Sequence, residues 1–100
     1  MKLERNYARE GTNPKGSEWK FYKANFEAGS IQVNNHTESG KWVYVLFLDT
    51  RIDCNDEYQT KEWAYSVALA HAVERMEVSL RQLKSAQQTL ALDGATVAEN

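Results

Sequence analysis

The chain has 100 residues, of which 42% are hydrophobic and 26% are charged, and its formal net charge at pH 7 is −2. A chain of this length fits one small domain with a modest core, for which assembly with another copy is one route to stability. The slight negative charge argues against nucleic-acid binding by the protein as a whole, because phosphate recognition depends on accumulated Lys and Arg.

The first 16 residues are polar, and glycines and a proline gather toward the end of this segment. Leu3 and Tyr7 have the spacing of one or two helical turns before these turn-forming residues begin. We therefore expect residues 1–16 to form an arm or a short N-terminal helix. Residues 17–94 would then form the domain and residues 95–100 a C-terminal tail.

Two segments with β-strand character follow the arm. Aromatic residues dominate residues 17–26, which predicts a first strand. Ile31 and Val33 share one face of a second, weaker strand whose other face is polar. Gly29 supplies the turn between the two strands.

The third predicted strand, residues 41–52 after Gly40, is apolar on both faces. Tyr44 and Leu46 lie on one face and Val45 on the other, so both faces need cover. In a simple three-stranded meander this strand is also an apolar edge, which a partner chain or the N-terminal arm must pair with or cover. The alternative order places this strand in the middle of the sheet and needs a less local connection.

One long helix is predicted after the strands, because no glycine or proline occurs between Gly40 and Gly94. Thr60 is suited to cap the first turn, although Asp56 and Gln59 form a competing capping box. Gly94 would end the helix, since glycine readily adopts the left-handed conformation found there. The expected fold class is thus α+β: a three-stranded antiparallel sheet followed by one long C-terminal helix of roughly 34 residues, about 50 Å long.

The predicted helix carries a heptad seam. Its positions recur at alternating spacings of three and four residues and are Ser66, Leu69, Val73, Met76, Leu80, Leu83, Gln87 and Leu90. Up to Val73 the helix is apolar nearly all round, which favours burial against the sheet. From Glu74 onward charged and amide residues leave only a narrow apolar stripe, and we expect this half to bind a second copy of the chain.

The residues beside the seam favour an antiparallel dimer. A parallel pair would join no opposite charges at the flanking positions, whereas an antiparallel pair with its axis near Leu80 and Arg81 brings Glu77 of each chain to Lys84 of the other. The alternative is a long helix that folds over its own sheet and ends in a frayed tail. The expected dimer interface comprises Leu69, Val73, Met76, Glu77, Leu80, Leu83, Lys84 and Leu90.

Acidic residues crowd the connection between the third predicted strand and the helix. They lack the spacing of a calcium-binding EF-hand loop. One interpretation is a solvated loop that caps the helix, and another is a surface that docks on a basic partner protein. The candidate contacts of this acidic loop are Asp49, Asp53, Asp56 and Glu57.

The sequence contains no constellation typical of catalysis or of metal or cofactor binding. Cys54 is the only cysteine, which excludes a disulfide within one chain and indicates a reducing compartment. Cys54 with the distant His36 and His71 does not make a zinc-binding set. We therefore expect no enzymatic activity and no cofactor. Without a secretory leader or an apolar run of membrane-spanning length, the expected location is cytoplasmic.

Aromatic and basic side chains interleave along residues 19–23, which we call the aromatic-basic strand. Its candidate partner contacts are Trp19, Tyr22 and Lys23. Exposed aromatic rings on a sheet can stack on bases while lysines meet phosphates. The simpler interpretation is a half-buried strand whose lysine stems lie over neighbouring rings.

These observations favour a small non-enzymatic homodimeric protein-binding module, which occludes a partner protein or bridges two partners. Compact proteins without motifs are common among phage and mobile-element accessory genes, including inhibitors of host defence of the anti-CRISPR type. The alternative function is a small nucleic-acid-binding regulator that uses the aromatic-basic strand.

Overall fold

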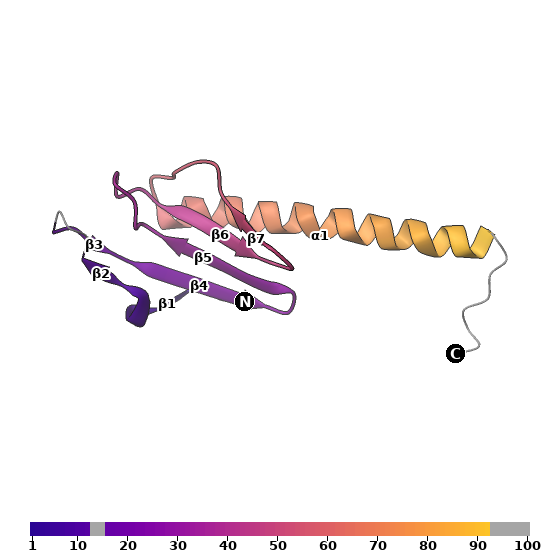
Figure 1. Ribbon diagram of the computed structural model, residues 1–100, viewed down its shortest axis with the longest axis horizontal. Coiled ribbons are helices and arrows are strands. Elements are labelled where there is room, and N and C mark those ends of the chain that lie inside the picture. Colours follow the sequence, from indigo (N-terminus) through magenta and orange to yellow (C-terminus); the bar gives the residue numbers. More distant parts are fainter. Residues whose placement is uncertain (13–15, 93–100) are drawn as a thin grey trace. The chain divides into compact units, whose positions relative to one another are not determined.

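The chain has an α+β fold in which short strands pair into sheets (Figure 1). The structure is a computed structural model, and it describes residues 1–12 and 16–92. One long helix, α1, spans Lys61–Leu92 in this part of the chain. The chain divides into two compact units, Met1–Ala70 and His71–Asn100. The first unit holds the strands and the first turns of α1, and the described part of the second unit is the rest of α1.

The main sheet has five antiparallel strands in the order β1-β4-β5-β6-β7. The predicted α+β class and long helix are confirmed, but the predicted number of three strands is wrong. The two strands that the sequence did not predict are only two and three residues long and lie at the sheet edges, so they leave no periodic pattern. The strands of the main sheet are β1 Glu4–Arg5, β4 Phe21–Phe26, β5 Gly29–Asn34, β6 Val43–Phe47 and β7 Arg51–Asp53.

The predicted third strand is a hairpin rather than one strand. The backbone N–H of Leu48 donates to the carbonyl of Thr50 at 3.1 Å and closes a turn after β6. β7 then returns beside β6, with Leu46 opposite Ile52. The apolar edge of β6 is therefore paired by the next segment of the same chain, and neither a partner nor the N-terminal arm is needed there. The alternative order is also wrong, because β5 lies between β4 and β6.

The N-terminal arm pairs at the opposite edge of the main sheet, where Glu4 of β1 lies opposite Lys23 of β4. A single 3-10 turn, η1 (Tyr7–Arg9), occupies the place of the predicted short helix. The predicted first strand, residues 17–26, is divided at Lys20 into two strands. The smaller sheet joins β2 Gly11–Thr12 to β3 Glu18–Trp19.

Alternation along the strands gives the main sheet a core face. The fully buried side chains Ala24, Ile31 and Leu46 lie opposite one another on β4, β5 and β6. Two small residues of the first helical turns, Ala64 and Ala68, are also fully buried. Small side chains at i and i+4 let a helix approach a sheet closely, so these turns of α1 cover the core face.

Gly29 is required by a close approach of two strands rather than by a turn. A Cβ atom on Gly29 would lie 1.8 Å from the carbonyl oxygen of Phe47. The turn between β4 and β5 is formed instead by Glu27 and Ala28. Gly40 does have the left-handed backbone of a turn glycine, with φ of 73°.

The start of α1 is where the sequence predicted it. The backbone N–H of Trp63 donates to Oγ1 of Thr60 at 3.0 Å, so Thr60 is the N-cap. The competing capping box at Asp56 would start the helix four residues too early, and α1 begins at Lys61. Gly94, the predicted end, lies outside the described residues, in which α1 continues to its last residue, Leu92.

Candidate functional site

The main sheet has a second face that points away from its core. Because Phe21 and Lys23 alternate with the core residues of β4, they lie on this open face. Asn34 of β5 lies opposite Phe21, and Gln32 lies opposite both Lys23 and Val45. The open face therefore combines aromatic, amide, aliphatic and basic side chains with two carboxylates, because Glu4 lies opposite Lys23 and Asp53 opposite Val45.

A groove of about 160 Å³ lies on the open face. Its most buried lining side chains are Phe21 and Val45, of which only 3% and 7% are exposed. These two apolar side chains belong to different strands, and the register of the sheet brings them to one surface. The groove is lined by Arg9, Trp19, Phe21, Gln32, Asn34, His36, Val45 and Arg51.

Two arginine side chains line this groove, and none of the carboxylates in residues 1–12 and 16–92 does. The Arg9 guanidinium lies 4.8 Å from the centre of the Phe21 ring, and that of Arg51 lies 5.8 Å from the centre of the Phe47 ring. Arg51 also pairs with Asp53 at 3.1 Å, but both side chains of this ion pair are more than 60% exposed. Such exposed pairs contribute little stability, so Arg51 can exchange one carboxylate for another.

Two of the residues that line the groove have stacked rings. Trp19 and His36 have ring centres 4.3 Å apart and planes inclined by 15°. Trp19 is held through its backbone, because β3 pairs with Gly11 of β2. A Cβ atom on Gly11 would lie 3.0 Å from Nε1 of Trp19, so the strand passes close beneath the indole ring.

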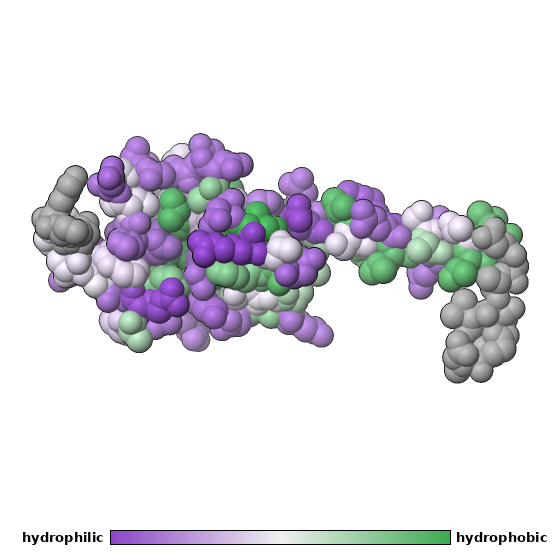
Figure 2. Space-filling view, in the orientation of Figure 1, coloured by the Kyte–Doolittle hydropathy of each residue, from purple (hydrophilic) through white to green (hydrophobic). Residues whose placement is uncertain are grey.

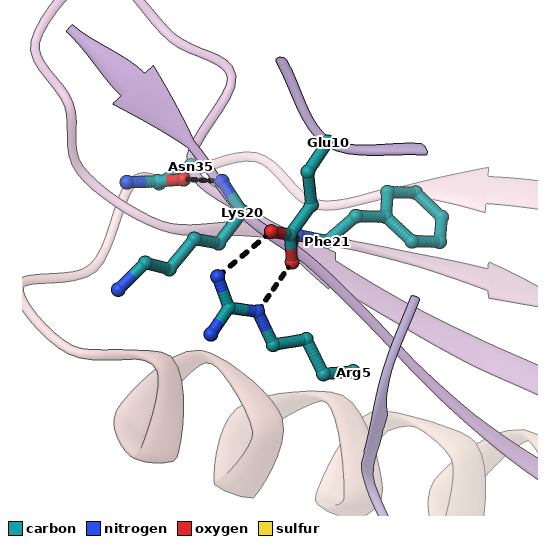
Figure 3. A network of polar contacts seen from close by, with 5 residues as sticks. All are labelled: Arg5, Glu10, Lys20, Phe21 and Asn35. Carbon is teal, nitrogen blue, oxygen red and sulfur yellow. Dashed lines mark hydrogen bonds and ion pairs between the residues drawn. The ribbon is translucent and has the colours of Figure 1, made fainter. Parts of the chain in front are cut away.

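Glu10 ties the N-terminal arm to β4 beside this groove. Figure 3 shows the Arg5 guanidinium and the Glu10 carboxylate joined by two hydrogen bonds, each 2.8 Å long. Glu10 also accepts the backbone N–H of Phe21 at 3.2 Å. The hydrogen bond with Arg5 is the main cause that lowers the pKa of the Glu10 carboxyl. Burial opposes this shift, and the hydrogen bond from the Phe21 N–H lowers the pKa further. Because η1 lies between the two partners, this contact also holds Arg9 near Phe21.

The structure separates the three predicted contacts of the aromatic-basic strand. Trp19 lines the groove and Lys23 lies on the same open face, whereas Tyr22 lies on the core face. The ring of Tyr22 is 5.9 Å from that of Trp42, centre to centre. The ammonium group of Lys61, the first residue of α1, lies 5.0 Å from the centre of the Tyr22 ring. Tyr22 therefore helps to hold the first turn of α1 against the core face of the sheet.

The four residues of the predicted acidic loop do not share one place. Asp49 lies in the turn that joins β6 to β7, whereas Asp56 and Glu57 follow β7 at the other end of that hairpin. Asp53 is paired with Arg51. Glu57 accepts a hydrogen bond from the Ser39 hydroxyl at 2.7 Å. The four carboxylates are thus divided between two ends of the hairpin.

The side chains of the heptad seam of α1 are exposed to solvent in the second unit. Figure 2 shows hydrophobic side chains among hydrophilic ones along the later turns of the helix. All described residues from Val73 onward are exposed, including Glu77 and Lys84, whereas Leu69 in the first unit is half-buried. The exposed fractions of the seam side chains are 54% for Val73, 42% for Met76, 50% for Leu80, 65% for Leu83 and 43% for Leu90.

Cys54 has a structural place beside β6. Its thiol donates to the carbonyl of Asp56 at 3.2 Å, and its Sγ accepts the backbone N–H of Tyr44 at 3.3 Å. Burial raises the pKa of the neighbouring Tyr44 and Tyr58 hydroxyls. Within residues 1–12 and 16–92, no three His, Cys, Asp or Glu side chains gather closely enough to hold a metal ion.

Sequence reasoning missed most of the groove. The predicted partner contacts did not include Arg9, Arg51, Gln32 or Asn34, which come from three different segments, η1, β7 and β5. One signal did point here: Val45 lies on the second apolar face of a strand that needed cover on both sides. That face is covered in part by side chains of the groove, which the sequence pattern alone does not bring together.

Comparisons of the chain with protein-family models, with curated proteins and with solved structures found no match. No helix in the described part of the chain is both long enough and apolar enough to cross a membrane.

Proposed function

We propose that this chain is a small non-enzymatic protein-binding module that works as an antiparallel homodimer. The observation that carries the proposal is the row of half-exposed apolar side chains along α1, from Val73 to Leu90. Apolar surface repeated at heptad spacing is stabilised when a second helix covers it. The described residues of the second unit contain no other element that could do so.

Charge complementarity supports a second copy as the occupant. With an axis between Leu80 and Arg81, Glu77 of one chain meets Lys84 of the other twice, and Leu80 of each chain lies at the centre. Small residues beside the seam, such as Ser79 and Ala86, permit close approach. A dimer of this kind presents two copies of the first unit, which suits bridging or two-point occlusion of a partner.

The mass in solution tests the dimer. Equilibrium sedimentation of the full chain should give twice the chain mass of 11.5 kDa. The Leu80→Glu variant should shift the equilibrium to monomer, because it places a carboxylate at the centre of the seam. The matched control is Val78→Glu, which changes an exposed valine on the opposite side of the helix. A wild-type mass of one chain at all micromolar concentrations would refute the proposal.

Disulfide trapping tests the direction of the two helices. In a Cys54→Ser background, chains carrying Glu77→Cys are mixed with chains carrying Lys84→Cys under mild oxidation. An antiparallel pair forms the mixed 77–84 disulfide, since these positions face each other. A parallel pair gives 77–77 and 84–84 products instead, and that pattern would contradict the antiparallel arrangement.

The acidic loop and the open face remain the two candidate partner surfaces, and we place the partner on the open face. Its side chains gather around one groove, whereas the acidic residues are divided between two ends of a hairpin. Inhibition of a host-defence protein, as anti-CRISPR proteins do, stays a prediction. Capture of a defined host protein by the wild type but not by Arg9→Gln would support it, and equal capture by both would argue against the open face.

A further inference from the structure

We infer that the groove on the open face receives an acidic side chain from an extended peptide segment of the partner protein. This inference rests on the protein-binding part of the proposed function and not on the dimer. It names the chemistry of the partner, and it assigns Arg9 and Arg51 as the residues that bind the incoming carboxylate.

The size of the groove limits what it can bind. A volume of about 160 Å³ is well below the roughly 300–1,000 Å³ of pockets that enclose a whole small-molecule ligand. It is sufficient for one side chain carried by a larger molecule. The groove is also open at the surface of the sheet, so the molecule that carries this side chain can lie across the strands.

The charge of the groove selects an anionic group. Arg9 and Arg51 line it from separate segments, and its other polar linings are the neutral amides of Gln32 and Asn34 and the ring of His36. Arginine presents a planar set of N–H donors that matches a carboxylate with two parallel hydrogen bonds. In this structure Arg51 donates two hydrogen bonds, of 3.1 and 3.2 Å, to the same oxygen of Asp53, and both side chains of this pair are exposed. A carboxylate from a partner can replace this oxygen without leaving a buried charge.

The floor of the groove favours a peptide over a polyanion. Phe21 and Val45 offer buried apolar surface, and the amide of Gln32 can both donate to and accept from a peptide backbone. The Asn34 oxygen already accepts the backbone N–H of His36 at 3.0 Å, so Asn34 offers its NH₂ group as a donor. A nucleic-acid strand gains affinity by adding phosphate contacts. Here the whole chain carries a net charge of −2. On the described part of the open face Lys23 joins the two arginines, but Glu4 lies opposite Lys23 and Asp53 lies opposite Val45. A segment with one or two carboxylates fits these few cations better than a strand with many phosphates.

The test is an NMR titration of the full chain with two blocked peptides, acetyl-Gly-Glu-Leu-Glu-Gly-amide and the same peptide with Gln in place of Glu. The Glu peptide should shift the side-chain N–H signals of Arg9 and Arg51 and the amide signals of Gln32 and Asn34, whereas the Gln peptide should not. Arg9→Gln or Arg51→Gln should weaken binding by about tenfold, as expected for loss of a hydrogen bond to a charged group. The matched control is Lys41→Gln, which removes an equal charge from an exposed residue outside the groove.

Three outcomes would overturn the inference: no shifts with the Glu peptide, equal shifts with both peptides, or shifts that survive in both arginine variants. An eight-residue oligothymidine is titrated in parallel, and binding by it in preference to the Glu peptide would overturn the choice of a peptide. Amide signal dispersion shows that each variant is folded. The sedimentation mass of the same samples separates the two proposals, because a monomer that binds the Glu peptide refutes only the dimer. A dimer that binds neither peptide refutes only the groove.

Discussion

Arg5 and Glu10 form a two-pronged ion pair in which Nε and Nη2 of the arginine each lie 2.8 Å from a different carboxylate oxygen. The same carboxylate accepts the backbone N–H of Phe21 at 3.2 Å, so one side chain fastens the arm to a strand eleven residues further along. The turn between Arg5 and Glu10 carries Arg9 to the open face. This contact therefore connects the stability of the arm to the shape of the groove.

Stability should depend on pH through Glu10. The pKa of this carboxyl is lowered in the folded chain below its ordinary value of 4.5, mainly by Arg5. Its charged form therefore stabilises the fold above that ordinary value, and the contribution is lost as the pH falls through the lowered pKa. We expect Glu10→Gln to unfold at a lower temperature than the wild type at neutral pH, with the difference disappearing in strong acid.

Thermal unfolding followed by circular dichroism at neutral and acidic pH measures this difference. Glu27→Gln is the control, because Glu27 lies exposed in the turn between β4 and β5. An unchanged gap between wild type and Glu10→Gln at both pH values would show that the carboxylate charge is not what matters.

Gly29→Ala should be strongly destabilising. The added Cβ would lie 1.8 Å from the carbonyl oxygen of Phe47, and this oxygen belongs to the backbone of β6. Relief therefore requires β5 and β6 to separate, and we expect a cost of about 3 kcal/mol or more in the free energy of unfolding. Urea denaturation at a fixed protein concentration measures it.

Gly40→Ala is the matched comparison for Gly29→Ala. It has open space around the new Cβ but a left-handed backbone with φ of 73°, so its cost should be only about 1–2 kcal/mol. A Gly29→Ala variant no less stable than Gly40→Ala would argue against the close approach of these strands.

Thr60→Ala should weaken the start of α1. The Thr60 hydroxyl accepts the backbone N–H of Trp63, and loss of such a cap costs about 1 kcal/mol. Thr60→Ser retains the oxygen and should retain nearly all of the stability. If urea denaturation gave Thr60→Ser and Thr60→Ala the same free energy of unfolding, the hydroxyl contact would not be the cause of the lost stability.

Reversing one charge beside the seam should weaken the proposed dimer, and reversing its partner as well should restore it. Glu77→Lys alone places like charges opposite Lys84 of the other chain, so sedimentation should show a weaker dimer. Glu77→Lys with Lys84→Glu restores opposite charges and should recover the wild-type dissociation constant within a few-fold. If the double variant is as weak as the single one, these residues do not face each other.

Features that depend on neighbouring residues could be predicted from the sequence. The start of α1 follows from the threonine that precedes it, and the length of the helix follows from the absence of glycine and proline. The buried faces of β5 and β6 follow from alternation, as Ile31, Val33 and Leu46 show. The sequence grouped Trp19, Tyr22 and Lys23 as partner contacts, whereas the register places Tyr22 on the core face and Lys23 on the open face. A run of interleaved residues does not say which alternate face is covered.

By itself the sequence determined the α+β class, the beginning of the helix and the exposed seam, since local backbone preferences and apolar spacing act over a few turns or residues. Only the tertiary structure decided the hairpin of β6 and β7, the need for glycine at position 29 and the groove on the open face. The lining of that groove comes from Arg9, Trp19, Asn34, Val45 and Arg51, and only the register between strands places them together. Register depends on backbone pairing between distant segments, which no local pattern of residues specifies.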